Sequence, residues 1–431
     1  ERSRAAGKIE TDDWVELIED EQSEFIGYDR IEAPVRITKY RKIKTKGKDL
    51  FQLVLNVTPF YPEGGGQVGD KGWLIAGDSK VKIIDTKKEN NLPVHFTTEL
   101  PEDLNALFTA KVDASQRQSS ARNHTATHLL HEALREVLGD HVEQKGSLVN
   151  GDYLRFDFSH FSKTNQEEIE KIEDLVNQRI IANLPLEEFR AIPIDEAKEK
   201  GAMMLFGEKY GDLVRMIQFG SSKELCGGTH VQASGEIGLF RIQSEGAVAA
   251  GIRRIEAVSG AAALAEARKE RNTLEELHQV LKQQDLLKAV QDLHTKAQDL
   301  TKKVEQFEKD KGKQVKQELK SKIQDLNGVP FLAEEVDLNG GQIRDIAFQL
   351  KGEMESLFAV FGSQAGGKVT ITCLVTEDLV KEKGLHAGNI VRELAKEIKG
   401  GGGGQPFFAT AGGKDPNGLP SAIKKASSYL S

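Results

Sequence analysis

The sequence predicts a multidomain protein of the α+β class, because the pattern of its 431 residues changes three times along the chain. Residues 30–115 alternate polar and apolar side chains between glycine-rich turns, which is typical of strands. Residues 261–326 hold no proline and a single glycine, and their Glu, Lys, Gln and Leu content favours long helices. Residues 116–260 and 327–431 mix both patterns. After a linker at 1–29 we therefore expect a small β-barrel-like domain, an α+β domain, a helical or coiled-coil arm and a C-terminal α/β domain.

The composition is that of a polar chain without a membrane partner. Hydrophobic residues make up 38% and charged residues 29%, and the formal net charge is −8. No run approaches the roughly 18 apolar residues of a transmembrane helix. Two cysteines cannot build a disulfide framework, so we expect a reducing, cytoplasmic location. The first residues carry neither Met nor an apolar signal core, so we expect them to continue a longer upstream sequence.

Because the net charge is negative, any contact with nucleic acid has to use local basic patches. One patch lies in the β-rich region, where seven basic residues and one acid fall from Val35 to Asp49. A solvated hairpin face and a nucleic-acid contact both fit it. The most distinctive segment of this region is TPFYPEGGGQVGDKG at 58–72, whose three consecutive glycines no strand interior would tolerate.

Two residue pairs in the next region have the spacing of metal ligands. His124 and His128 lie four apart on a predicted helix, so both imidazoles project from one face. Cys226 and His230 lie four apart in ELCGGTH, where the glycines allow a loop to wrap around an ion. A set of three histidines and one cysteine suits tetrahedral Zn²⁺ better than Mg²⁺ or Ca²⁺. The helix lacks the glutamate of a zincin peptidase. His131 is expected either to lie behind the metal ligands without binding the ion or to lie on the surface.

The helical arm carries a heptad seam. Its apolar residues step by four and three, and they are Leu286, Val290, Leu293, Ala297, Leu300, Val304 and Phe307. An earlier apolar set is out of phase with them across residues 283–285, so two helices or one stuttered coiled coil both fit. The seam is expected either to pack on its own chain or to pair two chains.

The last region combines basic residues with a glycine run. Residues 390–431 contain six basic and three acidic side chains. The run at 400–404 is either a linker or a loop whose backbone amides face phosphate. Cys373, in the apolar segment TITCLV, is expected to be an inert core thiol.

Several of these segments resemble the alanyl-tRNA synthetase family, in the order of that family and across essentially the whole chain. NHTATHLLHEALREVLGDHVEQKGSLV, MLFGEKYGDLVRM, ELCGGTHV and GIRRIEAVSG are similar to its editing domain, and TPFYPEGGGQVGDKG to the β-domain before it. The helical arm and GGGGGQPFFATAGG are similar to its C-terminal domain, which is related to glycine-rich domains of DHH phosphoesterases. The first residues resemble the join after the aminoacylation half.

The resemblance implies a C-terminal fragment of an alanine-tRNA ligase that hydrolyses mischarged Ser-tRNA(Ala) and Gly-tRNA(Ala). An amino-acid pocket sized for alanine cannot exclude glycine and rejects an added hydroxyl weakly, so a second, hydrolytic site is needed. By resemblance, one Zn²⁺ per chain is held by His124, His128, Cys226 and His230. The implied substrate pocket contains Gln144, Thr125, Thr127, Gly227, Gly228 and Thr229. ATP and Mg²⁺ are needed only for alanylation, which the resemblance assigns to the N-terminal half.

The expected partners are tRNA(Ala) and a second copy of the chain bound through the C-terminal region. The residues expected to contact tRNA are Lys399, Gly400, Gly401, Gly402, Gly403, Gly404, Lys414, Arg253 and Arg254.

Two other functions stay open at this point. A free-standing trans-editing hydrolase shares the zinc motifs but usually lacks the coiled coil and the glycine-rich domain. The second is a non-catalytic coiled-coil protein that binds nucleic acid and keeps the zinc site without activity. Release of serine from Ser-tRNA distinguishes an editing hydrolase, which performs it, from this protein, which does not. The related editing domain of threonyl-tRNA synthetase has similar metal spacing, but the surrounding motifs fit it poorly.

Overall fold

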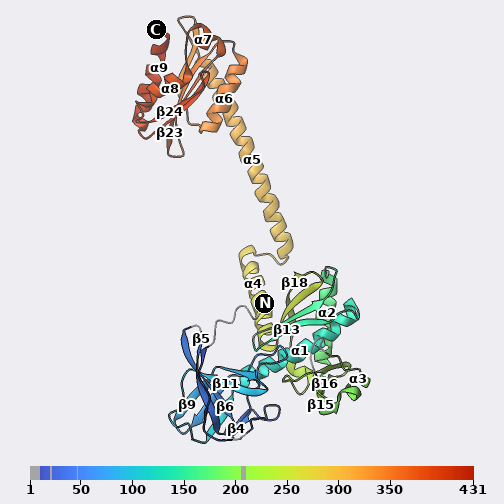
Figure 1. The fold of residues 1–431 in the computed structure, drawn as a ribbon. Helices are drawn as coiled ribbons and strands as arrows, with labels where there is room; N and C mark the ends of the chain where they lie inside the picture. The colour runs from blue at the N-terminus through green and yellow to red at the C-terminus, as the bar shows by residue number, and fades with distance from the viewer. Residues whose placement is uncertain (1–9, 20–21, 46, 205–209) are drawn as a thin grey trace. The chain divides into compact units, whose positions relative to one another are not determined.

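The computed structural model describes residues 10–19, 22–45, 47–204 and 210–431. They form two compact units, which are divided between Leu277 and His278 (Figure 1). The motif MLFGEKYGDLVRM spans residues 204–216, and its second to sixth residues, 205–209, lie outside the described residues, as does the beginning of the expected upstream linker.

The β-rich part of the first unit consists of two open sheets rather than the expected barrel. The larger sheet has the order β1 (Glu10–Thr11), β5 (Ile37–Thr45), β6 (Lys48–Leu55), β11 (Leu92–Thr97) and β10 (Asp85–Glu89), with β2 (Val15–Glu16) also paired to β5. The smaller has the order β4 (Glu32–Val35), β12 (Phe108–Val112), β8 (Gly72–Ala76) and β9 (Ser79–Ile83). A short parallel pair joins β3 (Glu24–Phe25) to β7 (Val57–Thr58).

The expectation of a barrel-like domain is therefore wrong, because the strands that the structure describes do not close into a barrel. A barrel needs every strand to be hydrogen-bonded on both sides. Among the described strands, those pairing paths end at β4 and β9 in one sheet and at β10 in the other. The apolar faces of the two sheets instead share one core around Leu53, Phe60 and Phe108.

The basic patch of the sequence lies on the β5–β6 hairpin. Arg41 binds the Glu89 carboxylate at 2.7 Å, and Lys42 binds Asp49 at the same distance. The fold thus neutralises part of this patch through Asp49 within the hairpin and Glu89 at the end of β10.

The second part of this unit is built around the helix α1 (Ala114–Leu138). Asp113 caps it by accepting a hydrogen bond from the backbone N–H of Gln116. The helix packs against α2 (Gln166–Ile181) and against an antiparallel sheet, whose strands in order are β13 (Gln144–Val149), β14 (Leu154–Ser159), β19 (Ile252–Ser259) and β18 (Phe240–Ala249). A separate sheet contains β15 (Leu186–Pro193), β16 (Leu213–Phe219) and β17 (Ser222–Leu225), beside α3 (Ile194–Glu199).

Two helices follow, α4 (Gly260–Leu281) and α5 (Leu286–Ser321), so the phase change of the sequence marks a break between helices. Lys282 leaves the helical region with a φ of +52°, and Asp285 caps α5 by accepting from the N–H of Lys288. Most heptad positions of α5 remain at least half exposed, for example Leu293 at 53% and Phe307 at 81%. In the part of the chain that the structure describes, no segment covers the seam.

The second unit places a six-stranded sheet between helices. The strand order is β20 (Gln324–Leu326), β21 (Val329–Glu335), β22 (Phe358–Ala365), β23 (Lys368–Val375), β25 (Phe408–Gly413) and β24 (Gly401–Gly404). The helices are α6 (Gly340–Glu353), α7 (Glu377–Glu382), α8 (Ala387–Ala395) and α9 (Leu419–Ala426).

Successive residues of the central strand β22 face two different cores, as the period of two in a strand requires. Phe358 and Val360 pack in the core that contains residues of α8 and α9, whereas Ala359 and Phe361 pack in the core of α6. Cys373 is fully buried in the first of these cores, and burial raises the pKa of its thiol above the ordinary value.

The glycine run is the edge strand β24, so neither the linker nor the loop expected from the sequence is present. A Cβ on Gly402 would lie 2.2 Å from the Thr410 carbonyl oxygen of β25, and one on Gly400 would lie 2.0 Å from that of Gly412. Gly401 has no such neighbour within 4 Å. Glycine is thus required at alternate positions because the strand lies so close to β25.

No helix among the described residues combines the length and the apolar character that crossing a bilayer requires.

Candidate metal centre

The structure brings the two predicted chelating pairs together. His124 and His128 lie on α1, and Cys226 and His230 lie on the loop that follows β17. One ligand atom from each of the four residues falls within 4.8 Å of the others. The Sγ of Cys226 is 3.4 Å from Nε2 of His124 and 3.3 Å from Nε2 of His230. Two segments about a hundred residues apart in sequence therefore converge on one point.

These donors fit a zinc ion. With bonds of about 2.3 Å to sulfur and 2.05 Å to nitrogen, the S–N edge of a tetrahedron is about 3.6 Å, close to the two distances above. Burial lowers the pKa of His124 to about 3, and the neighbouring His128 adds to this shift. Burial also lowers the pKa of His128, and it lowers that of His230 strongly. The three imidazoles are thus neutral near pH 7, which is the form that binds a metal ion.

Each histidine has a polar neighbour outside the group of four. Nδ1 of His124 lies 2.7 Å from Oε1 of Gln67, and Nδ1 of His230 lies 3.1 Å from the hydroxyl of Thr125. Nε2 of His128 lies 3.6 Å from a carboxylate oxygen of Glu224. The contacts of His124 and His230 are hydrogen bonds, which fix the ring orientation and the tautomer of a metal-binding histidine, whereas that of His128 is a longer charge contact.

Glu224 joins His128 to the spare histidine of the sequence analysis. Its other oxygen lies 2.9 Å from Nδ1 of His131. Burial alone would raise the pKa of the Glu224 carboxyl, but the nearby His128 and His131 lower it below its ordinary value. A buried carboxylate therefore lies beside His128 of α1, the helix that carries two of the four candidate donors.

The loop 226–230 is held from behind by Arg215 of β16. One guanidinium nitrogen donates to the carbonyl oxygens of Cys226 at 2.8 Å and of Gly228 at 2.7 Å. The same guanidinium binds Glu188 and stacks on the ring of Tyr28, 4.0 Å from its centroid. These contacts fix the direction in which the loop presents its thiolate.

Tyr28 adds a contact from the N-terminal part of the chain. Its hydroxyl donates to the Gly227 carbonyl oxygen at 2.7 Å. Gly228 has to be glycine, because a Cβ at this position would lie only 1.9 Å from Cε1 of His124. The sequence CGGTH thus allows the loop to lie directly on the His124 ring.

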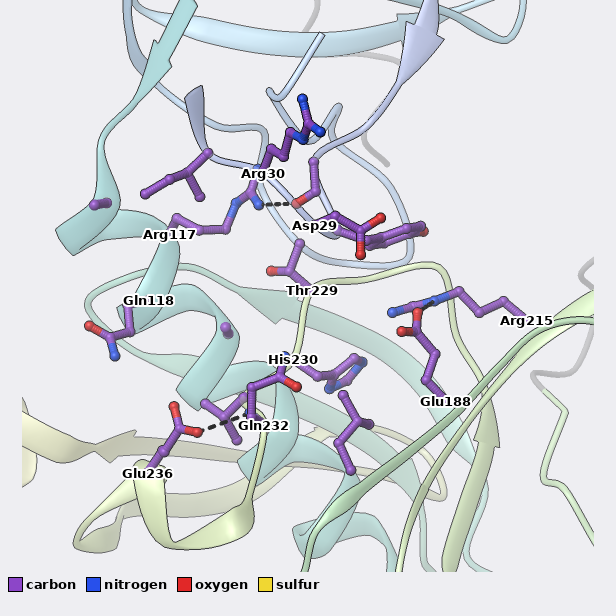
Figure 2. A pocket seen from close by; sticks show the side chains of 17 residues that line it. Asp29, Arg30, Arg117, Gln118, Glu188, Arg215, Thr229, His230, Gln232 and Glu236 are labelled. Atoms are coloured by element: carbon purple, nitrogen blue, oxygen red, sulfur yellow. Dashed lines mark hydrogen bonds and ion pairs between the residues drawn. The ribbon is translucent and has the colours of Figure 1, made fainter. Parts of the chain in front are cut away.

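A cavity of about 320 Å³ lies beside this loop (Figure 2). Figure 2 shows Thr229 and His230 in its middle, with Arg215 and Glu188 on one side and Arg117 and Gln118 on the other. The cavity therefore gives small molecules access to one face of the loop that carries His230.

The remaining predicted pocket residues differ in how closely they contact the four donor residues. Thr229 is buried and bonded to Gln67 through both its N–H and its hydroxyl. Thr127 donates to the Asn123 carbonyl oxygen within its own helix. Gln144 begins β13, and the described hydrogen bonds connect its side chain to none of the four donor residues.

Most residues expected to contact tRNA through their charge have intramolecular partners. Arg253 binds Glu245, Arg254 binds Asp157 at 2.6 Å, and Lys399 binds Asp415 at 2.7 Å. Lys414 is exposed in the second unit. The arginines and Lys399 would contact phosphate only in competition with these carboxylates.

Sequence reasoning missed four residues that hold the site: Gln67, Glu224, Arg215 and Tyr28. Glu224 lies two residues before Cys226, inside the motif that pointed to the metal. Gln67 directly follows the three glycines of the 58–72 segment. The sequence pattern made this segment conspicuous but gave no function for it. Nothing local in the sequence signals Arg215 or Tyr28, because their contacts span long separations.

Three family models match parts of the chain. The model described as "Threonyl and Alanyl tRNA synthetase second additional domain" matches residues 214–256, which include Cys226 and His230. The model for "tRNA synthetases class II (A)" matches residues 1–116, and the "DHHA1 domain" model matches residues 328–431. Together with the fold and the four-donor site, these matches define the class as that of the aminoacyl-tRNA synthetases.

Individual relatives narrow the class further. An Alanine--tRNA ligase of Christiangramia forsetii is 52% identical over 433 residues, covering 100% of this chain and 50% of the relative. The corresponding ligase of Cytophaga hutchinsonii is 48% identical, with the same coverage. That of Bacteroides thetaiotaomicron is 52% identical, covering 99% of this chain and 49% of the relative. The chain belongs to the alanyl-tRNA synthetase family, and it spans about half the length of the curated relatives it matches.

Among solved structures, the C-Ala domain of the Aquifex aeolicus alanyl-tRNA synthetase matches 25% of this chain and 97% of its own. The sequence identity is 24% and the TM-score is 0.24.

Proposed function

We propose that this chain carries the hydrolytic editing site of an alanine-tRNA ligase, which releases serine or glycine from mischarged tRNA(Ala). The observation that carries the proposal is the convergence of His124, His128, Cys226 and His230 within 4.8 Å. The match of residues 214–256 to a synthetase additional domain supports it. One Zn²⁺ per chain is the ion that this set of donors fits best.

Four protein ligands would close the zinc shell, so a bound zinc would act as a Lewis acid on an oxygen of the substrate or of water only through a fifth position or by exchange of one ligand. The chain itself holds the donors in place. Arg215 and Gln67 fix the loop, and Thr125 orients His230 from behind. Neutral, buried imidazoles keep their lone pairs available near pH 7, so the site is formed before the aminoacyl ester arrives.

Such a site selects serine over alanine through the side-chain hydroxyl, which alanine lacks. A hydrophobic pocket discriminates an added hydroxyl by only about a hundredfold, whereas a polar site that binds the hydroxyl rejects the analogue without it more strongly. The serine hydroxyl is a ligand for polar groups at the metal centre, and the alanine methyl group is not. Gln144, Thr127, Gly227, Gly228 and Thr229 remain our proposed pocket residues, and Thr125 belongs with them as the partner of His230.

The 431-residue chain is therefore expected to hydrolyse Ser-tRNA(Ala) faster than Ala-tRNA(Ala). The measurement is the initial rate of amino-acid release from the two esters, prepared on the same tRNA and compared at equal concentrations. Equal rates on both esters would show that no second selection operates here. A chain without activity on either ester would favour the non-catalytic nucleic-acid binder.

The full alanine-tRNA ligase activity is a proposal for the longer protein. The relatives carry that name and are about twice as long as this chain. We assign ATP- and Mg²⁺-dependent alanylation to the half of the relatives that this chain does not cover, and we place the protein in the cytoplasm. The coverage of the whole chain by these ligases, including its helical arm and its C-terminal unit, favours this assignment over a free-standing trans-editing hydrolase.

Binding of tRNA(Ala) and pairing of two chains are further proposals. The second unit offers the exposed Lys414 and the accessible strand β24, on which Gly401 leaves its backbone open. The proposed tRNA contacts also include three residues that are now paired with carboxylates, namely Lys399, Arg253 and Arg254. On binding, each would give up its ion pair and contact a phosphate of the tRNA instead. The exposed apolar seam of α5 supports a homodimer through this region, because burial of its leucines against a second copy removes them from water.

A further inference from the structure

Gln67 is fully buried and connects the two halves of the metal centre through one side-chain amide. Its Oε1 lies 2.7 Å from Nδ1 of His124 and 2.9 Å from the backbone N of Thr229. Its Nε2 donates to the hydroxyl of Thr229 at 2.9 Å. One contact thus reaches the helical pair of donors, and two reach the loop that carries the other pair.

The orientation of this amide follows from its neighbours. A backbone N–H can only donate, so the amide atom facing Thr229 N has to be the carbonyl oxygen. The same oxygen faces Nδ1 of His124, which must then carry the proton. Nε2 of His124 consequently keeps its lone pair, and this is the nitrogen that lies 3.4 Å from the Cys226 thiol.

The backbone around Gln67 is fixed independently of the metal centre. The N–H of Val68 donates to the Val149 carbonyl oxygen at 3.0 Å, and the N–H of Val149 donates to Gly66 at 2.8 Å. Gly66 has a φ of +85°, and a Cβ there would lie 2.9 Å from the Ser147 carbonyl oxygen. The glycines before Gln67 therefore allow this segment to lie against the end of β13.

We propose that Gln67 is a positioning residue of the metal centre, which selects the metal-binding tautomer of His124 and locks the CGGTH loop against it. The inference rests on the proposed binding of a metal by the four donors. It extends the centre into the β-rich part of the unit, to a residue 57 positions before His124. The chain then needs the 58–72 segment for a complete metal site, which gives the three consecutive glycines a function.

The test compares the zinc affinity of full-length variants by competition with a chromophoric chelator. Q67M keeps the length of the side chain but forms none of its hydrogen bonds. Q67N keeps a polar amide that is one methylene too short to reach both partners. Loss of an outer partner of a metal ligand typically costs about 10–100-fold in affinity, and we expect such a loss in both variants.

Q67E is the rescue variant. Its carboxylate accepts from Nδ1–H of His124 and from both the N–H and the hydroxyl of Thr229, so zinc affinity should stay within about threefold of wild type. The matched control is Q52M, because Gln52 is also buried in the β-rich part and bonded to Arg41 and Glu89. We expect wild-type zinc affinity in this variant.

A spectroscopic measurement separates positioning from general stability. With Co²⁺ in place of zinc, the intensity of the visible d–d bands reports tetrahedral geometry and the thiolate charge-transfer band reports the bond to Cys226. Both should weaken in Q67M and Q67N and persist in Q67E and Q52M. Zinc affinity within threefold of wild type in Q67M and Q67N would overturn the inference, as would equal losses in Q67E or Q52M. A wild-type chain that binds no zinc would instead overturn the proposed function.

Discussion

Replacement of His128 by alanine is expected to lower the rate of serine release from Ser-tRNA(Ala) by more than a hundredfold. The variant loses one of four donors, whereas loss of an outer hydrogen-bond partner alone typically costs about 10–100-fold. It also leaves the buried Glu224 carboxylate without one of the two histidines beside it. The measurement is the initial rate of release of labelled serine at saturating zinc.

The matched control for this variant is His141→Ala. His141 is exposed, and its ring stacks on His160 outside the group of four donors. Its loss should leave the rate within about twofold, because surface substitutions away from special features change stability by no more than about 0.5 kcal/mol. Serine release at the wild-type rate in the His128 variant would contradict our assignment of this residue.

Replacement of Arg117 by methionine is expected to destabilise the first unit by about 3–5 kcal/mol, the cost of removing one partner of a buried ion pair. The guanidinium of Arg117 binds Asp70, and it donates to the carbonyl oxygens of Gly27 at 2.6 Å and Pro59 at 2.8 Å. Burial raises the pKa of the Asp70 carboxyl, and the Arg117 guanidinium opposes this rise. The variant leaves that carboxyl and two carbonyl oxygens without the donor that ties α1 to the β-rich part.

Urea unfolding followed by tryptophan fluorescence measures this effect. Both tryptophans of the chain, Trp14 and Trp73, lie in the β-rich part, so their signal reports the first unit. The control is Arg271→Met, which removes an exposed ion pair with Glu275 and should change the stability by less than about 0.5 kcal/mol. Equal unfolding midpoints for wild type and the Arg117 variant would refute the structural role of this pair.

The positions of the four donor residues could be predicted because each pair is local. A spacing of four on a helix, or within a glycine loop, brings two side chains to one side whatever the rest of the fold does. The sequence also located the phase change at residues 283–285, although two helices and one stuttered coiled coil both fitted it. The structure has two helices there, with Asp285 as the N-cap of α5.

The residues that hold the donors could not be predicted, because their contacts are long-range. Gln67 meets Thr229 across 162 positions, and Tyr28 meets Gly227 across 199. No local periodicity encodes such pairs. The glycine runs at 64–66 and 400–404 showed only that the backbone needs room. The structure supplies the neighbours that some of these glycines approach, Ser147 for Gly66 and strand β25 for Gly400 and Gly402.

The strand pairing of the β-rich part was also beyond sequence reasoning. Alternating side chains identify a strand and its buried face, but they do not identify its neighbours. A barrel and two open sheets with one shared core have the same alternation. The β24 strand shows the same limit, because a run of glycines lacks the side chains from which alternation is read.

The central claim is that His124, His128, Cys226 and His230 together bind one zinc ion, and elemental analysis of purified, metal-replete chain tests it most directly. We predict one zinc per chain in the wild type and loss of that zinc in Cys226→Ala, the variant that removes the thiolate donor. A wild-type chain without zinc, or a Cys226→Ala chain that retains one equivalent, would contradict it.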